Sequence, residues 1–164
     1  MNLANLSSKP AESASQEKVK LLVFPIGNLN MALHIDVVQK IVNFSTVYSS
    51  GLNHYGMVNL EGEEITVLDL NQRLFHLPQT FENQEKKYLL LAQNSGGERF
   101  GIIIQNTPSL FDVTLNRIRA LPASYRQADT LKIATHVTMI PLEEEKELTV
   151  FILDPDELIN PNTN

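Results

Sequence analysis

The chain has 164 residues, of which 43% are hydrophobic and 20% are charged, and its formal net charge is −6. This composition is typical of one soluble globular domain, or of two very small domains in contact. The acidic balance excludes non-specific binding to nucleic acid or anionic lipid, because both need a basic surface.

The sequence carries no signal for export, membrane insertion or disulfide formation. No apolar run approaches the roughly 20 residues that a transmembrane helix needs. The first residues lack the apolar core and cleavage site of a signal peptide. There is no cysteine, which excludes disulfides and thiolate chemistry and suits a reducing compartment. We therefore expect a cytoplasmic protein with no direct membrane insertion.

Residues 1–17 are rich in Ser, Ala, Glu and Gln and are predicted to be a disordered tail. From Lys18 onward, short apolar runs alternate with turn signals, which is typical of β-strands. Asp36 can cap one helical turn, and Asp69 can cap a short helix that begins at Leu70. The strands expected in this half are Lys20–Phe24, Met31–Leu33, Ile41–Phe44, Gly56–Leu60 and Ile65–Leu68.

The opening pattern recurs after a polar connector near residues 79–86, about 69 positions downstream. Strand Tyr88–Ala92, a turn at Gly96-Gly97 and the return strand Phe100–Ile104 repeat the earlier hairpin, which turns at Gly27-Asn28. Such a duplication predicts two similar β units. Further strands are expected over Val113–Leu121, Ile133–Ile140 and Leu148–Leu153, and Asp154-Pro155 is typical of a helix start.

The fold class predicted from this pattern is all-β, with a few short helices including one at the C-terminus. About ten short strands with turns every 8–12 residues favour small barrels over a βαβ sheet. Each half has too little core to be stable alone, so two barrel subdomains over residues 18–160, with a boundary near residues 79–86, should pack together.

No arrangement of residues in the sequence is typical of catalysis, and we expect no cofactor and no enzyme activity. The histidines are too far apart for the common metal spacings, although a metal site built from distant residues stays open. Phosphate-binding and dinucleotide-binding glycine motifs are missing. The acids at Glu63-Glu64 and from Glu143 to Glu147 are better explained as solvated turns than as catalytic carboxylates. This profile favours a binding module.

One segment resembles the signature of the CheW family. Residues 56–62 read G-M-V-N-L-E-G and residues 65–70 read I-T-V-L-D-L. They are similar to the family's strand of the form G-hydrophobic-hydrophobic-N-L-R-G and its following strand that ends in D-L. Further matches cover most of the chain from Lys18 to Ile159, at Phe24–Gly27, Val38–Ile41, Phe100–Ile104 and Leu153–Ile159.

The resemblance implies a fold of two SH3-like five-stranded barrels and a non-catalytic adaptor function. The implied partners are the regulatory domain of a CheA-type histidine kinase and the cytoplasmic helical-hairpin tip of a methyl-accepting chemoreceptor. The implied process is bacterial chemotaxis, phototaxis or twitching motility, at membrane-associated receptor arrays. A CheW-like module that acts on a pilus motor or a response regulator outside an array remains the alternative.

The resemblance also implies which residues contact these partners. For each apolar position, ordinary barrel core is the competing interpretation. By matched positions the receptor groove would involve Val38, Ile41, Leu90 and Gly101, the kinase-facing connection would include Asn106, Thr107 and Leu110, and the signature turn would contribute Asn59, Leu60, Glu61 and Gly62.

Two charges depart from the family pattern together. Lys40 stands where the family usually has an acid, and Glu61 stands where it usually has an arginine. If the two side chains meet, their ion pair has inverted polarity and could reject partners suited to the opposite sign. We hypothesise a paralogue with its own receptor–kinase set. Drift of two surface charges is the competing interpretation.

Overall fold

The computed structural model describes residues 17–43, 48–49, 55–76, 87–126 and 132–159. Residues 1–16 of the expected tail and the connector expected over residues 79–86 lie outside these ranges. None of the helices within them is long and apolar enough to span a membrane.

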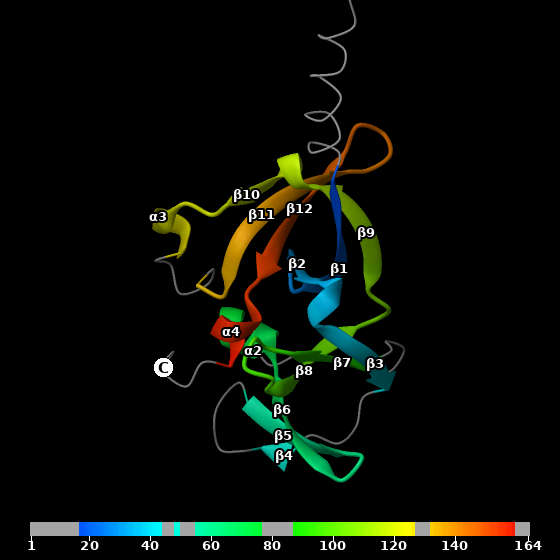
Figure 1. Ribbon diagram of the computed structural model, residues 1–164, viewed down its shortest axis with the longest axis vertical. Helices are drawn as coiled ribbons and strands as arrows, with labels where there is room; N and C mark the ends of the chain where they lie inside the picture. The colour runs from blue at the N-terminus through cyan, green and yellow to red at the C-terminus, as the bar shows by residue number, and fades with distance from the viewer. Residues whose placement is uncertain (1–16, 44–47, 50–54, 77–86, 127–131, 160–164) are drawn as a thin grey trace, which may run out of the picture.

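Strands dominate the described chain, which confirms the all-β prediction (Figure 1). The helical segments are short: the 3₁₀ turns η1 (Ile35–Val37) and η2 (Leu115–Arg117), and the helices α2 (Leu70–Phe75), α3 (Ala123–Arg126) and α4 (Pro155–Leu158). The strands are β1 (Lys18–Ile26), β2 (Leu29–His34), β3 (Val38–Asn43), β4 (Tyr48–Ser49), β5 (Tyr55–Leu60), β6 (Glu63–Leu68), β7 (Lys87–Gln93), β8 (Arg99–Gln105), β9 (Ser109–Thr114), β10 (Ile118–Ala120), β11 (Ala134–Pro141) and β12 (Glu147–Leu153).

The strands form two curled sheets, as Figure 1 shows. Sheet A has the order β10-β11-β12-β2-β1-β9, and sheet B has the order β3-β7-β8-β6-β5-β4. The short strands β4 and β10 extend the five-stranded arrangement expected for each barrel. The two-barrel fold and its short C-terminal helix are therefore confirmed.

The two repeated hairpins are exchanged between the sheets. The hairpin β1–β2 belongs to sheet A, where β2 runs parallel to β12 from the other end of the chain. The hairpin β7–β8 belongs to sheet B, where β8 runs parallel to β6. Each barrel is thus completed by a hairpin from the other half of the sequence, so strand membership does not follow the division near residues 79–86.

Local signals for caps and turns are partly confirmed. The Asp69 side chain accepts a hydrogen bond from the Gln72 backbone N–H at 3.1 Å and caps α2, and Asp154 caps α4 in the same way. The helical turn expected after Asp36 instead begins two residues earlier, at Ile35 of η1. Its cap is His34, whose Nδ1 accepts from the Asp36 N–H at 3.1 Å.

The single strand expected over Val113–Leu121 is wrong. The chain there ends β9, forms the turn η2 and starts β10. Since β9 and β10 lie at opposite edges of sheet A, a continuous strand could not join them.

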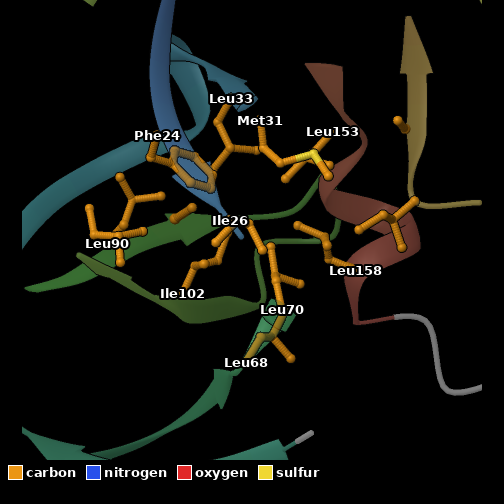
Figure 2. Packing of buried hydrophobic residues seen from close by; sticks show 14 of the residues in the cluster. Phe24, Ile26, Met31, Leu33, Leu68, Leu70, Leu90, Ile102, Leu153 and Leu158 are labelled. Atoms are coloured by element: carbon orange, nitrogen blue, oxygen red, sulfur yellow. The ribbon is translucent and has the colours of Figure 1, made fainter. Parts of the chain in front are cut away.

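The buried side chains form three clusters. Sheet A and sheet B each enclose a smaller one, and the largest lies between the sheets and draws on both. Strand β1 alternates between two of them: Leu22 and Phe24 enter the central cluster, whereas Leu21 and Val23 enter the interior of sheet A. Figure 2 shows Phe24 and Leu33 from sheet A packed near Leu90 and Ile102 from sheet B. The central hairpins are thus buried on both faces, which explains their uninterrupted apolar runs.

We predict that the two sheets unfold together, because the central cluster is shared. Leu33→Ala in sheet A should lower the free energy of unfolding by about 2–5 kcal/mol. Urea denaturation followed by circular dichroism gives this loss, and hydrogen exchange shows whether β7 and β8 of sheet B open with it. Thr149→Ala, at an exposed position of the same sheet, is the control and should cost less than about 0.5 kcal/mol. Unchanged protection of β7 and β8 in Leu33→Ala would contradict shared unfolding.

Candidate functional site

The edge strand β3 carries an exposed apolar residue that continues the central cluster to the surface. Ile41 lies directly opposite Leu90 of β7 in antiparallel register, so their side chains share one face of sheet B. Leu90 is fully buried in the central cluster, whereas Ile41 is 38% exposed. Ile41 is therefore the accessible end of a row of core residues.

Strand β9 provides the same arrangement at the edge of sheet A. Leu110 lies opposite Leu22 of β1, a member of the central cluster, and is 53% exposed. Ile41 and Leu110 are separated by the same interval that relates the two hairpins in the sequence. The duplication thus places one exposed apolar side chain on each of these two edge strands, opposite a residue of the shared core.

The other residues expected in the receptor groove are less accessible. Val38 is half-buried and packs against the central cluster. Gly101 is buried between Leu91 and Val67 of the neighbouring strands. A Cβ at this glycine would stand 2.9 Å from Leu89 Cδ1, so the position requires a residue without a side chain. Leu90 lies beneath this surface, whereas Gly101 faces Leu89 in the interior of sheet B. Val38 and Ile41 are the residues that a partner could touch.

The signature segment forms the tight turn between β5 and β6. Glu61 and Gly62 both have positive φ, 56° and 82°, a conformation that glycine adopts without strain. Leu60 packs against the cluster inside sheet B, and Asn59 is exposed. The polar side chains of Asn59 and Glu61 are therefore exposed at this turn, and Leu60 anchors it to the apolar interior of sheet B.

Lys40 and Glu61, the two residues whose charges depart from the family pattern, contact each other across sheet B. Lys40 Nζ lies 2.5 Å from Glu61 Oε1, and both side chains are exposed. Lys40 belongs to the edge strand β3, whereas Glu61 belongs to the β5–β6 turn, which lies beyond β7 and β8 in the strand order. This contact confirms the pairing that the sequence left conditional. The ion pair connects two distant parts of the curled sheet.

A second set of polar side chains also connects β3 with other strands of sheet B. The sequence analysis did not predict these contacts. Arg99 binds Glu63 through an ion pair of 2.6 Å and donates from Nε to Gln39 Oε1 at 2.8 Å. Gln39 in turn donates to Gln93 Oε1 at 2.8 Å. Gln93 and Arg99 flank the Gly96-Gly97 turn, so the sequence could have indicated that these two residues are neighbours in the hairpin. It could not have indicated their contacts with Gln39 or Glu63.

These charges change the acidity of Glu61. The hydrogen bond and the positive charge of Lys40 hold the pKa of the Glu61 carboxyl below its ordinary value, and the more distant Arg99 acts in the same direction. The carboxylate therefore stays ionised, and paired with Lys40, to a lower pH than an isolated glutamate would.

The expected kinase-facing connection joins the two sheets, since it leads from β8 to β9. Asn106 has a φ of 59° and, like Thr107, is exposed. Leu110 follows at the start of β9. This connection and the β3 edge thus both lie where the chain passes from one sheet to the other.

Across the described ranges, no group of three or more His, Asp or Glu side chains could hold a metal. A shallow polar pocket of about 270 Å³ lies beside β3. There Asp156 accepts hydrogen bonds from the Ser95 N–H and Oγ, which lower the pKa of its carboxyl. These bonds attach α4 to the β7–β8 turn.

Comparison with known proteins identifies the architecture. The family model for the CheW-like domain matches residues 20–162. Among solved structures, the scaffolding protein TtCheW from Thermoanaerobacter tengcongensis is similar with a TM-score of 0.71 and 17% sequence identity, over 90% of this chain and 92% of that one. A search of curated proteins gives no match.

We predict that Lys40→Met raises the pKa of the Glu61 carboxyl toward its ordinary value, because the hydrogen bond and the charge that lower it are removed. In the wild type, the folded pKa is below the unfolded one. The pair therefore stabilises the fold above the ordinary carboxyl pKa, and this contribution is lost as pH falls through the lowered value. Carboxyl NMR titration measures both pKa values. Lys20→Met, which removes the partner of Asp112 instead, should leave Glu61 unchanged. An equal pKa in wild type and Lys40→Met would refute the assignment.

Proposed function

Because this chain belongs to the CheW-like domain family, we propose that it is a non-catalytic adaptor that couples methyl-accepting chemoreceptors to a CheA-type histidine kinase. The observation that carries the proposal is the family match over nearly the whole described chain. The pair of exposed apolar residues on the two edge strands supports it, since such residues are suited to protein docking.

We assign the two edges to the two partners. The helical hairpin of the receptor docks along β3, with Ile41 as its apolar contact and Val38 beside it. The regulatory domain of the kinase docks on the connection that ends at Leu110. Both edges share the central cluster, so a partner on one side lies close to the core residues that support the other.

An adaptor of this kind works without a reactive group. Holding a receptor and a kinase on one scaffold raises their effective concentration for each other. Binding one conformation of the kinase more tightly than another shifts its conformational equilibrium. In this function the protein acts in the cytoplasm, is recruited to membrane-associated receptor arrays and does not insert directly into the membrane.

We predict that the two edges can be separated by mutation. Leu110→Asp should weaken binding to the purified regulatory domain of the cognate kinase at least tenfold and leave receptor binding within about twofold, because only one apolar contact is lost. Ile41→Asp should have the reverse effect on a receptor-tip hairpin. Isothermal titration calorimetry measures both affinities.

Leu142→Asp is the matched control, since Leu142 is 41% exposed on a different surface, and it should change neither affinity. Failure of the wild type to bind any CheA-type regulatory domain would contradict the adaptor function. Binding to a pilus motor or a response regulator in its place would favour the alternative.

We further propose that the Lys40–Glu61 pair selects among paralogous partners. The double variant Lys40→Glu/Glu61→Arg keeps an ion pair but reverses its polarity, so the turn should remain in place while the charge facing a partner changes sign. In pull-downs against the cognate receptor-tip hairpin and a paralogous one, the variant should shift its preference at least tenfold toward the paralogue, because Lys40 lies on the edge strand β3. Lys20→Asp/Asp112→Lys reverses an ion pair elsewhere and should shift nothing. Unchanged preference in the first variant would show that the two charges are drifted surface residues.

A further inference from the structure

A second surface, on the outer side of sheet A, has properties that the adaptor function does not use. A pocket of about 440 Å³ is lined there by residues of η2, β10, β11 and β12, among them Arg117, Arg119 and Met139. Ile118 lies between the two arginines and packs toward the interior of sheet A, so the arginines are directed outward. Met139 is 47% exposed, a large value for an apolar side chain of that size.

The charges along this surface are separated. Both arginines are exposed, and neither takes part in an ion pair with another described residue. Past Met139 the strand β11 ends, and the turn that follows carries the exposed acids Glu143 and Glu145. They too form no ion pair within the described chain, because Lys146 pairs with Glu144.

Met139 lies beside the two arginines, and Leu142 lies between them and the acids along the chain. Met139 is opposite Thr149 in the ladder of β11 and β12, and Leu142, just beyond β11, is 41% exposed. The strip is therefore basic around Met139, apolar at Leu142 and acidic beyond it. A strip with this order is complementary to itself when one copy is turned by 180° about its centre, because each basic end then meets an acidic end.

We propose that this strip, from Arg117 and Arg119 through Met139 and Leu142 to Glu143 and Glu145, binds a second copy of the chain in an isologous dimer. The two-fold axis passes between Met139 and Leu142, so these side chains bury each other. Each copy then contributes two arginines and two glutamates, and all of them gain a partner of opposite charge.

The second copy is favoured by charge complementarity. The chain carries a net charge of −6, so two copies repel over long range, and only an arrangement that brings local opposites together can overcome this repulsion. The strip is short, and its interface should fall below about 1,200 Å², as in transient complexes. Association is therefore expected at micromolar concentrations or above and should weaken with salt. The proposal goes beyond the adaptor function and uses neither Ile41 nor Leu110.

Charge exchange provides the test. One variant, Arg117→Glu/Arg119→Glu, makes both ends of the strip acidic, and a second variant, Glu143→Arg/Glu145→Arg, makes both ends basic. By sedimentation equilibrium, each variant alone should dimerise at least tenfold more weakly than the wild type. An equimolar mixture should recover dimers, because every contact between the two variants again joins opposite charges.

Glu64→Arg/Glu98→Arg is the matched control, since it makes the same change of net charge at exposed positions of sheet B and its adjoining turn. It should not form dimers with Arg117→Glu/Arg119→Glu. Circular dichroism checks that all variants are folded. A wild type that stays monomeric to about 0.5 mM would overturn the proposal. Dimerisation that persists in both variants alone would also overturn it, because the interface would then lie on another face.

Discussion

The burial of both faces of the two central hairpins is the constraint on which the rest of the structure depends. Leu22 and Phe24 pack into the cluster between the sheets while Leu21 and Val23 of the same strand fill one barrel. In strand β7, Leu90 likewise packs into the cluster between the sheets, whereas Leu89 and Leu91 pack into the interior of sheet B. Because apolar burial is the largest favourable contribution to folding, hairpins buried on both faces hold the two barrels together. The exchange of hairpins between the halves of the chain strengthens this connection.

The candidate docking surface is a consequence of that core. Ile41 and Leu110 remain exposed on edge strands because each is the last residue of a row whose inner members are buried. Their positions are held by Leu90 and Leu22 beneath them, so a partner meets pre-positioned side chains and little ordering is needed on binding. The polar contacts of Arg99 with Gln39 and Glu63, and of Lys40 with Glu61, connect β3 with β8, with β6 and with the β5–β6 turn beside this surface.

Fold and surface charge are therefore separate properties of this member of the CheW-like family. The fold is retained at 17% identity to TtCheW, since it needs apolar residues at alternating positions rather than particular ones. The pair of Lys40 and Glu61 can have either polarity without affecting the core, because both side chains lie at the surface. Under the proposed function, partner specificity would change through such residues while the scaffold stays the same.

The sequence by itself determined the strand class, the repeated hairpins, the caps at Asp69 and Asp154, and the family, because period-two burial and capping are local properties of the chain. It did not determine which strands are neighbours, so the exchange of hairpins and the turn that divides β9 from β10 were not predicted. Only the tertiary structure separated buried Leu90 from exposed Ile41 and brought Arg99 to Gln39 and Glu63. These contacts join residues that are distant in sequence. They depend on which strands pair in the sheet, and the sequence of a single strand does not specify its neighbours.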